Sequence, residues 1–442
     1  MSGIAAEIAS WRAAQRGRSG FRCDEMPLSE LRAWRMDAAG LAHASGGFFR
    51  IAAVRTRSSE AALDGLAQPF ILQPEIGILG FLARPGEDGP ELLVQAKTEP
   101  GNEGATQLAP SFQCTPSNYT ARHGGTPAPY LDAFADAAGT VLSDLRQSEQ
   151  GTRFLGKFNR NMVVMLPRAA APEPAGAAWR WLRAADLLSL LDQDNMLNTD
   201  ARSVLVGTPW RHWAGGTPFA RWRGTGGFGA TLHASHGHGG TAEAVAWLMA
   251  RRAAATIANE HVALADLPSW RAGGAAITPS AAGGFAVRGY RVVAEDREVP
   301  AWDQPLVDSA GVGLIALLCQ RRDGVLRVLV QARAEPGLAN LVEVAASVQV
   351  APGEAPMGLA AELASLVASG TMHTACRQSE EGGRFHRDLN DYRVVELPEE
   401  LRLDLPDSYR WISVGALEGL CTTPGLVTNE ARSAASLLLT LV

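Results

Sequence analysis

The sequence lacks an apolar run long enough to cross a membrane. Its longest apolar stretches, residues 312–319 and 436–442, are much shorter than the roughly 20 residues that a membrane-spanning helix requires. Residues 1–17 contain no continuous apolar stretch and no small-residue cleavage site, and they predict a helix instead of a signal peptide. We therefore expect a cytoplasmic protein that makes no contact with a membrane.

Cysteine pairs and blocks of basic charge are also missing. The 442 residues include five cysteines, which are scattered along the chain, so free thiols in a reducing compartment are expected. The formal net charge is −6, and the basic residues are not gathered into one stretch. Because nucleic-acid binding needs a basic face, nucleic acid is not an expected partner.

Several catalytic motifs are absent as well. The sequence has no Gly-Lys-Ser/Thr phosphate loop and no Gly-x-Ser-x-Gly nucleophile elbow. The glycine-rich stretch 224–229 does not follow a predicted strand, so it does not indicate a dinucleotide site. Redox and phosphoryl-transfer chemistry are therefore not supported, and no cofactor is expected.

What the sequence does contain is a long internal repeat. Residues 93–101 read Leu-Val-Gln-Ala-Lys-Thr-Glu-Pro-Gly, and residues 329–337 read Leu-Val-Gln-Ala-Arg-Ala-Glu-Pro-Gly, 236 positions later. The same offset relates Trp11 to Trp247 and continues over about a hundred residues. A repeat of this length is far longer than the period of a solenoid, so each copy should be a domain with its own core.

Further along the chain the offset falls slightly, which sets the boundaries of the two copies. Arg-Gln-Ser-Glu-Gln-Gly at 146–151 matches Arg-Gln-Ser-Glu-Glu-Gly at 377–382, and the final matches lie 230 positions apart. We predict a first copy over residues 1–206, a linker or lid over 207–240, and a second copy over 241–442.

The linker is rich in glycine, tryptophan and histidine. Its His233, His236 and His238 are candidate metal ligands, but no cysteine or carboxylate lies beside them, and a flexible polar loop explains them as well. No metal site is predicted on this basis.

Both copies mix strand-like runs with a few helices, which indicates an α+β fold of a mixed sheet packed with helices. Strands are expected at 47–54, 76–82, 92–97 and 161–166, and in the second copy at 285–293, 312–318, 326–333 and 392–397. Helices are expected near the N-terminus and at 128–145, 184–191, 359–368 and 414–420.

The first copy keeps polar side chains that the second copy has lost. After Gln113 it has hydroxyl or amide groups at Thr115, Ser117, Asn118, Tyr119 and Thr120, whereas the matching stretch 351–356 keeps only one carboxylate. Serine, threonine and asparagine are also common turn residues that bond only the local backbone. Tyr119 fits that explanation less well and is a candidate acid, base or oxyanion donor.

A second difference lies in the strand near residue 160. The first copy has Lys157, Arg160 and Asn161 beside Asn159, where the second copy has Asp388, Asp391 and Tyr392 beside Asn390. Together with Arg153, these cations suit a diphosphate group. The alternative is a solvated, charged strand edge.

Other charged residues occur in both copies, which indicates a role that the two copies share. Glu99, Glu149, Arg153 and Arg202 match Glu335, Glu380, Arg384 and Arg432. Structural ion pairs are as good an explanation for them as substrate binding.

The repeated motifs together resemble the NDP-hexose 2,3-dehydratases of deoxysugar biosynthesis. The matching stretches are residues 93–101, 113–120, 127–131, 147–151, 159–164 and 200–203. The resemblance covers about residues 7–440 and implies two fused Nudix-like domains from an internal duplication. The Arg-Glu-x-x-Glu-Glu-x-Gly box of hydrolytic Nudix enzymes is absent, so the metal site of a hydrolase is not expected.

The resemblance also implies a reaction. The substrate would be dTDP-4-keto-6-deoxy-D-glucose, and dehydration would give a 3,4-diketo-2,6-dideoxy sugar that a partner 3-ketoreductase reduces. Such chemistry needs a base, an acid and donors to an enolate oxygen. We expect Tyr119 and Glu149 as acid and base, with Asn118, Gln113 and Lys97 orienting the sugar or its enolate. The predicted substrate-binding residues are Gln113, Thr115, Ser117, Glu99, Arg153, Lys157, Asn159, Arg160, Asn161 and Arg202.

Because the motif of residues 113–119 is eroded in the second copy, we expect the first copy to carry the chemistry. Two alternatives remain open: a nucleotide-sugar hydrolase on the same fold, and a non-catalytic protein that binds dTDP-sugars. A homodimer is expected from the resemblance.

Overall fold

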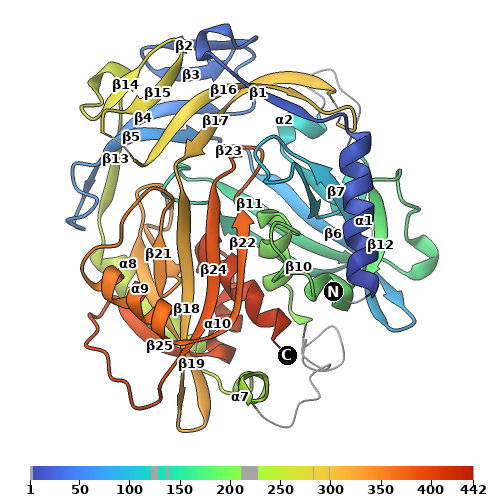
Figure 1. Ribbon diagram of the computed structural model, residues 1–442, viewed down its shortest axis with the longest axis vertical. Coiled ribbons are helices and arrows are strands. Elements are labelled where there is room, and N and C mark those ends of the chain that lie inside the picture. The colour runs from blue at the N-terminus through green and yellow to red at the C-terminus, as the bar shows by residue number, and fades with distance from the viewer. Residues whose placement is uncertain are drawn as a thin grey trace.

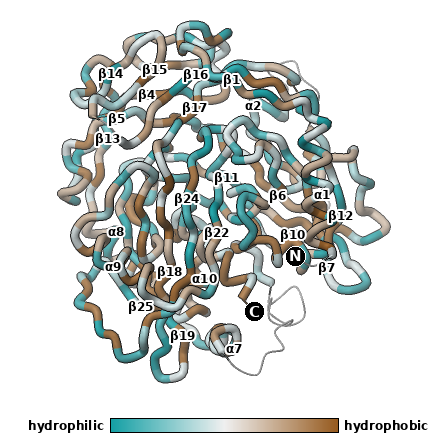
Figure 2. The backbone as a smooth tube through the Cα atoms, in the orientation of Figure 1, coloured by the Kyte–Doolittle hydropathy of each residue, from teal (hydrophilic) through white to brown (hydrophobic). Residues whose placement is uncertain are grey.

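A computed structural model describes residues 3–120, 128–135, 139–210, 227–281, 283–297 and 299–441. This part of the chain is a mixed α+β structure with two seven-stranded central sheets and two smaller outer sheets. The central sheets lie side by side, and the outer sheets sit together at one end of the molecule (Figure 1). Hydrophobic stretches follow the strands of the central sheets, while the outer loops are mostly hydrophilic (Figure 2).

The first central sheet has the strand order β10-β11-β6-β7-β12, with β8 beside β7 and β9 beside β6. β11 runs parallel to β6, and the other neighbours are antiparallel. The strands are β6 (Gly77–Gly86), β7 (Gly89–Thr98), β8 (Thr106–Ala109), β9 (Phe112–Cys114), β10 (Thr140–Ser148), β11 (Phe158–Met165) and β12 (Trp179–Arg183).

The second central sheet repeats this arrangement, with the order β20-β19-β18-β24-β22, β21 beside β18 and β25 beside β19. Its single parallel pair in the described residues, β18 with β24, corresponds to β6 with β11. The strands are β18 (Val312–Arg322), β19 (Val325–Ala334), β20 (Val342–Ala345), β21 (Val348–Val350), β22 (Thr371–Ser379), β24 (Leu389–Leu397) and β25 (Tyr409–Ser413).

The two outer sheets exchange a strand between the copies. β1 (Arg22–Met26) belongs to the first copy but pairs with β16 (Phe285–Val293) of the second. β13 (Ile257–Val262) of the second copy pairs with β4 (Arg50–Ser58) of the first. The registers match as well, because Arg22 opposite Val293 and Ala258 opposite Arg57 are related by the 236-residue offset. The remaining outer strands are β2 (Trp34–Asp37), β3 (Gly40–His43), β5 (Ala67–Leu72), β14 (Trp270–Ala272), β15 (Ala276–Pro279), β17 (Ala301–Ser309) and β23 (Phe385–His386).

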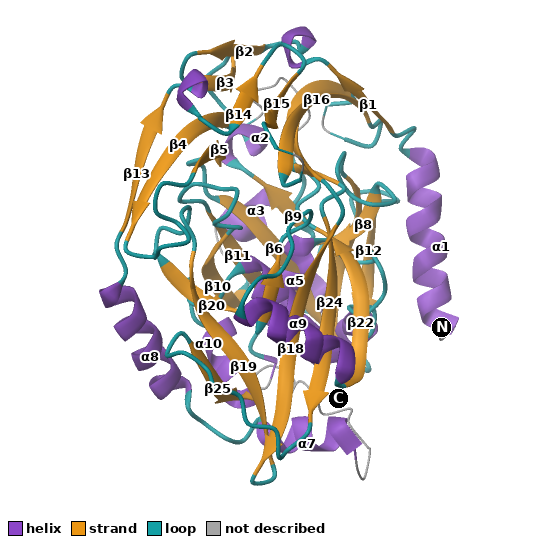
Figure 3. Ribbon diagram, turned by 60° about the vertical axis from the view of Figure 1, so that its left-hand side comes forward, coloured by secondary structure: helices purple, strands orange, loops and turns teal. Residues whose placement is uncertain are grey.

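Helices cover the edges and faces of these sheets. α1 lies along the outside of the molecule, where it packs on β7 and β8 (Figure 3). α5 and α11 pack against each other. The helices are α1 (Gly3–Arg18), α2 (Pro116–Tyr119), α3 (Leu131–Ala135), α4 (Ala184–Leu188), α5 (Thr199–Val206), α7 (Gly227–Ser235), α8 (Thr241–Ala254), α9 (Leu359–Ser369), α10 (Val414–Cys421) and α11 (Asn429–Ser436), with short 3-10 turns at Leu28–Glu30, Arg168–Ala170, Leu264–Asp266 and Leu437–Thr440.

The Glu-Pro-Gly motif that is repeated in the sequence marks a crossing point between the copies. The Gly101 N–H donates to the Gly382 carbonyl at 2.8 Å, and the Gly337 N–H donates to the Gly151 carbonyl at 2.7 Å. A Cβ atom at Gly101 would lie 1.4 Å from a backbone oxygen of Phe385. Only glycine permits so close an approach of two backbones, which explains why the motif occurs twice.

Most expected elements are confirmed, including the N-terminal helix, the helix near 359–368 and the paired strands. The helix predicted over 128–145 is wrong: among the described residues only Leu131–Ala135 is helical, and residues 140–148 form β10. In β10 the side chains of Ser143, Leu145 and Gln147 are buried in alternation, which is the burial pattern of a strand.

The segment 207–240 is not wholly irregular. Residues 227–235 form α7, whose Leu232 is fully buried in the core of the second copy. Residues 211–226 lie outside the described part of the chain. All five cysteines are free thiols, and no helix in the described ranges is long and apolar enough to span a membrane.

Candidate active site

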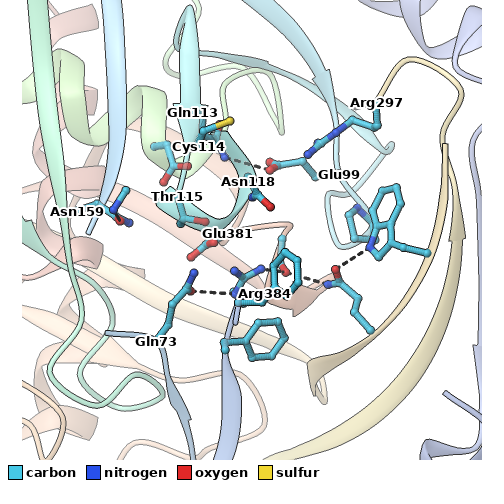
Figure 4. A pocket seen from close by; sticks show the side chains of 18 of the residues that line it. Gln73, Glu99, Gln113, Cys114, Thr115, Asn118, Asn159, Arg297, Glu381 and Arg384 are labelled. Carbon is cyan, nitrogen blue, oxygen red and sulfur yellow. Dashed lines mark hydrogen bonds between the residues drawn. The ribbon is translucent and has the colours of Figure 1, made fainter. Parts of the chain in front are cut away.

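A cavity of about 390 Å³ lies where the first central sheet meets segments of the second copy. Strands β7, β9 and β11 and helix α2 of the first copy form one side. The turn that contains Glu381 and Arg384 of the second copy closes it from the other side (Figure 4). Both copies therefore build this first cavity.

One wall of the first cavity is a locked network of three predicted residues. Lys97 lies near the end of β7 and Glu99 directly follows that strand, and the Lys97 Nζ atom lies 3.7 Å from Glu99 Oε1. Gln113 on β9 donates through Nε2 to Glu99 Oε1 at 3.0 Å, and its backbone carbonyl accepts from Lys97 Nζ at 3.0 Å. Asn198 holds the other end of the Gln113 amide through a 2.9 Å hydrogen bond. The network fixes a cation and a carboxylate beside each other with little freedom to move.

Helix α2 carries two further predicted residues into the first cavity. Thr115 is the extended N-cap residue and Pro116 follows at the first helical position, where proline is favoured because no backbone donor is lost. Thr115 and Asn118 both line the cavity. The Thr115 hydroxyl is buried without a hydrogen-bond partner among the described residues, so it is available to a ligand.

Ser117 of the same helix serves as an anchor. Its hydroxyl and its backbone N–H both bind the Glu75 carboxylate, and its hydroxyl also accepts from the Phe48 N–H at 3.4 Å. Ser117 is therefore next to the cavity wall and positions α2 and Phe48, which does line the cavity.

Asn159 lies on β11, and Lys157 directly precedes that strand. Lys157 donates to the Glu75 carbonyl, and burial lowers the pKa of Lys157 to about 8, against the opposing pull of nearby Glu149 and Glu381. Asn159 donates to Glu149 Oε1 at 2.7 Å and accepts from the Gly77 N–H at 3.0 Å. Both residues line the cavity.

Glu149 lies behind Asn159. Its second oxygen, Oε2, accepts from Asn429 of the second copy at 2.9 Å. Burial, followed by the charge of Glu381, raises the pKa of Glu149 to about 7. With both carboxylate oxygens engaged by amides, Glu149 orients Asn159 and does not itself face the cavity.

Acidic and basic side chains from both copies meet in the first cavity. Burial raises the pKa of Asp200 well above its usual range, and the charges of Glu381, Glu149 and Glu99 raise it further. Burial also raises the pKa of Glu381, although Arg384 and Lys157 oppose this shift. Buried carboxylates with displaced pKa values in a cavity are typical of acid–base sites.

Aromatic side chains form another part of the cavity lining. Trp34 packs against Phe49 with 4.9 Å between ring centroids, and Trp302 of the second copy lines the same region. The Arg384 guanidinium lies 4.3 Å above the Phe49 ring and donates to Gln73 at 3.1 Å. The cavity lining thus combines aromatic rings and a guanidinium with acids, lysines and amides.

Tyr119 does not line the first cavity. Its ring packs against the hydrophobic layer beneath α2, with 6.3 Å between its centroid and that of Phe112. Because α2 is a single turn, consecutive side chains point in different directions, and Asn118 faces the cavity instead.

Four other predicted residues also lie elsewhere. Arg160 forms an exposed ion pair with Asp144, at 2.6 Å. Asn161 donates to the Ser203 hydroxyl at 2.6 Å on the buried face of α5. Arg202 is buried between the copies, where it binds the Ser433 hydroxyl and the Ser379 carbonyl.

Arg153, the fourth, lines a second cavity of about 40 Å³. Seven residues of that cavity match residues of the first one in the aligned sequence: Arg333 with Lys97, Gln349 with Gln113, Asp388 with Lys157, Asn390 with Asn159, Glu430 with Asp200, Gln150 with Glu381, and Arg153 with Arg384. The turn at 149–154 reaches into the second cavity and the turn at 380–385 reaches into the first. Arg153 was expected in the site of the first copy, but it lines the second cavity, and its matching residue Arg384 lines the first cavity.

Sequence reasoning missed the contribution of the second copy to the first cavity. Glu381 and Arg384 are visible in the repeated turn, and the exchange of Gln150 for Glu381 is a clear difference between copies. The expectation that each copy completes its own site hid their role. Asp200 is a further lining residue; it lies in the matching stretch 200–203 but was not selected, and Gln73 and Trp302 line the cavity without having been singled out as candidates.

Of the candidate metal ligands, His233, His236 and His238 lie in the described part of the chain and do not form a metal centre there. The His236 Nδ1 atom lies 2.8 Å from Glu418 Oε2, and His233 is on α7. Over the described ranges, no group of three or more histidine, cysteine, aspartate or glutamate side chains is arranged to hold a metal ion.

The first cavity has the size, enclosure and converging polar groups of a small-ligand site for acid–base chemistry. Comparison with known proteins gives the family. A family model described as NDP-hexose 2,3-dehydratase matches residues 5–207 and 241–438. This chain belongs to the NDP-hexose 2,3-dehydratase family.

Three relatives match over nearly the whole chain, and each is named dTDP-4-dehydro-6-deoxy-alpha-D-glucopyranose 2,3-dehydratase. The relative from Saccharopolyspora spinosa is 34% identical over 440 residues, covering 97% of this chain and 90% of the relative. The relative from Streptomyces violaceoruber is 33% identical, covering 96% of this chain and 94% of the relative. The relative from Amycolatopsis orientalis is 32% identical, covering 97% and 88%.

Proposed function

We propose that this protein is a hydro-lyase that removes water between C2 and C3 of dTDP-4-keto-6-deoxy-D-glucose. The product is the 3,4-diketo-2,6-dideoxy sugar nucleotide of deoxysugar biosynthesis. Family membership and the names of three near-full-length relatives support this reaction. The structural observation that carries it is the first cavity, in which carboxylates, lysines and amides surround a space of about 390 Å³.

The mixture of aromatic, charged and amide side chains in the first cavity suits a nucleotide sugar. The aromatic side chains of Trp34 and Phe49 offer faces on which a thymine ring stacks. Arg384, fixed by Gln73 and Phe49, is a forked cation for the diphosphate, the role expected earlier of Arg153. The sugar then lies among Lys97, Asn118 and Lys157. Lys97 and Asn118 keep the roles expected from the sequence, whereas Lys157 was expected to bind the diphosphate.

The reaction proceeds through an enolate. The C4 ketone acidifies the hydrogen on C3, and removal of that proton places negative charge on O4. Loss of the C2 hydroxyl as water leaves a C2–C3 double bond, and the resulting enol becomes a ketone when C2 accepts a proton. No electron acceptor is needed, so the chemistry requires no redox cofactor.

Three residues are proposed to act on these charges. Asn118 and Lys97 stabilise the oxyanion at O4, because preorganised donors strengthen the binding of charge that develops in the transition state. Lys157 gives its proton to the departing C2 hydroxyl, since a pKa near 8 is well matched to proton donation at neutral pH. Glu149 and Gln113 hold Asn159 and Lys97 in place.

The reaction is also proposed to be independent of a metal ion. The sequence lacks the glutamate box that binds metal in hydrolytic Nudix enzymes, and Lys97, Lys157 and Arg384 are cations already placed in the first cavity. Dehydration is expected to continue in EDTA. Loss of activity in EDTA that one metal restores would contradict this.

The fold is proposed to be two Nudix-like domains from an internal duplication, residues 1–206 and 241–442, joined by residues 207–240. The matching order of strands in the central sheets and the matching registers of the exchanged strands support this proposal. An experimental structure in which the two central sheets failed to superpose would refute it.

The expected partners follow from the family resemblance. A 3-ketoreductase consumes the diketo product, and the chain forms a homodimer in the cytoplasm. Light scattering at micromolar concentration tests the dimer, and a monomer would contradict it.

A coupled assay tests the reaction itself. The protein is incubated with dTDP-4-keto-6-deoxy-D-glucose, NADPH and a 3-ketoreductase, and the nucleotide sugars are identified by mass spectrometry. The expected product has lost one water and gained the two hydrogens of reduction. Release of dTMP would identify a hydrolase instead, and tight dTDP binding without loss of the ketosugar would identify a binding protein.

A further inference from the structure

We propose that Glu381, which belongs to the second copy, is the base that removes the C3 hydrogen in the first cavity. This assignment rests on the dehydratase function proposed above. It makes the active site a product of both copies instead of a property of the first copy alone.

The backbone holds Glu381 at this position. Its turn is fastened to the end of β7 by two hydrogen bonds, from the Gly101 N–H to the Gly382 carbonyl and from the Arg387 N–H to the Gly101 carbonyl, each 2.8 Å long. A Cβ atom placed on Gly383 would lie 3.5 Å from Glu381 Oε1 and 3.9 Å from Glu99 Oε1. The two carboxylates, one from each copy, therefore converge on the same part of the cavity. Figure 4 shows Glu381 between Thr115 and Arg384.

Among the glutamates in and around the first cavity, Glu381 has the carboxylate with the fewest hydrogen bonds. Glu99 accepts from Gln113 through Oε1 and from Asn102 through Oε2. Glu149 accepts an amide hydrogen bond on each oxygen. Glu381 Oε2, in contrast, is shielded from solvent and has no hydrogen-bond partner among the described residues.

Two aspartates also line the cavity. Asp303 is held in an ion pair by Arg291 at 3.1 Å, and Asp200 is poorly suited to act as a base. Burial, followed by the charges of three neighbouring carboxylates, raises the pKa of Asp200 well above its usual range, which disfavours the ionised form that a base needs. Glu381 faces Arg384 and Lys157, whose charges favour its ionised form and so offset part of the effect of burial.

The matching position of the second cavity has no base. It is occupied by Gln150, whose Nε2 donates to Glu380 Oε2 at 2.8 Å. The cavity around it measures about 40 Å³, too small for a nucleotide sugar. Residues 147–151 and 378–382 differ at one position, where the first copy has Gln150 and the second has Glu381. The acid is thus found at the residue that lines the larger cavity.

In the proposed step, the Glu381 carboxylate takes the C3 hydrogen as a proton. The electron pair of the broken C3–H bond forms the C3–C4 double bond, and the charge moves to O4. When the C2–O bond breaks, electrons return from O4 to form the C2–C3 double bond, and the hydroxyl leaves as water with a proton from Lys157. The substrate is neither oxidised nor reduced.

Glu381→Gln tests this step with substrate labelled by deuterium at C3. Release of the label to water reports cleavage of the C3–H bond, and trapping by the reductase reports the complete reaction. We expect both rates to fall together by about 10²–10⁴-fold, the usual loss for a general base, while the affinity for dTDP stays unchanged. Glu103→Gln is the matched control, because Glu103 is a half-buried acid that does not line the cavity and pairs with Arg387 at 3.8 Å.

The outcomes separate the base from the function as a whole. Normal label release with lost dehydration, or near-normal rates of both, would show that Glu381 is not the base while leaving the dehydratase function intact. If the wild-type protein formed no dehydrated product, the proposed function would itself be wrong. Glu381→Asp, which withdraws the carboxylate by one methylene, is expected to fold normally and to slow both rates less than Glu381→Gln does.

Discussion

Asn118 and Tyr119 are adjacent residues with different surroundings. Asn118 lines the first cavity, whereas the Tyr119 ring packs against Phe112 in a hydrophobic layer. The sequence alone favours the tyrosine, because a phenol is the more versatile acid–base group. The geometry favours the amide, because only its side chain reaches a bound sugar.

This pair gives the first prediction. Tyr119→Phe is expected to keep near-normal turnover, because the change removes a hydroxyl that does not reach the cavity. Asn118→Ala is expected to lower kcat by about 10²–10³-fold, the usual effect of losing a donor to a developing oxyanion. Steady-state kinetics of the two variants, with melting temperatures as a check on folding, decide between them. A large loss in Tyr119→Phe with little change in Asn118→Ala would return the tyrosine to the catalytic role.

Lys157 gives the second prediction. Because burial lowers the pKa of Lys157 to about 8, its protonated fraction should fall above that pH, and kcat/KM should fall with it. Lys157→Arg should be slower but should lack this alkaline limb, since a guanidinium stays protonated. A pH profile of kcat/KM from 6 to 10 shows whether the limb is lost. An identical limb in both proteins would assign it to another group.

The sequence predicts which types of side chain form the site better than it predicts which individual residues line the cavity. Lys97, Glu99, Gln113, Thr115, Asn118, Lys157 and Asn159 were selected from the sequence and line the first cavity. Arg153 was selected for its charge, and its matching residue Arg384 stands in that cavity instead. Residue type and repetition are visible in a sequence, but the crossing of two turns between copies is set by backbone contacts far apart in the chain.

At the scale of elements, the crossing turns depend on two glycines. A Cβ atom at Gly101 would overlap the Phe385 carbonyl oxygen, 1.4 Å away, and one at Gly337 would lie 1.7 Å from the Phe154 carbonyl oxygen. Neither backbone can retreat without breaking hydrogen bonds that join the copies.

Gly101→Ala is therefore expected to destabilise the protein by about 3 kcal/mol or more, near the upper end for single substitutions. It should also lower activity, because the displaced turn carries Glu381 and Arg384. Chemical denaturation and turnover measure the two effects. Gly176→Ala is the control, because a Cβ atom there meets nothing within 4 Å. Equal stability of the two variants would show that the turn does not need glycine at position 101.

Elements with a regular pattern were predictable, and the exception has a physical reason. The strands near 312–318 and 326–333 are confirmed because long β-branched and apolar runs are bounded by turn residues. The helix predicted over 128–145 is wrong because its alanines favour a helix locally, while pairing of residues 140–148 with β11 decides the structure. Strand pairing is a tertiary contact that local propensity does not contain.

At the scale of the whole molecule, each half of the chain is incomplete without the other. β1 and β13 each pair with a strand of the opposite copy, and one hydrophobic core joins residues of both outer sheets. Arg202 and Arg432 reach across the boundary to Ser433 and Ser203.

Residues 1–210 and 227–442 produced as separate chains are therefore expected to be poorly folded alone and to assemble into an active complex when co-expressed. Each chain lacks one outer strand and leaves an open sheet edge, which favours aggregation. Circular dichroism, size-exclusion chromatography and the coupled assay follow the outcome. A cooperatively folded first half with full activity would contradict the shared site.

The most direct test of the account compares one residue of the first cavity with its match in the second. Asn159 and Asn390 make the same buried hydrogen bond to a glutamate, at 2.7 Å and 2.8 Å, so alanine at either position removes an equivalent contact. The measurement is the rate at which each variant and the wild-type protein convert dTDP-4-keto-6-deoxy-D-glucose to the dehydrated, reductase-trapped sugar. We predict that the wild type forms this product, that Asn159→Ala loses most of its turnover, and that Asn390→Ala retains it. Lost turnover in Asn390→Ala with normal turnover in Asn159→Ala, or no dehydrated product from the wild type, would contradict the account.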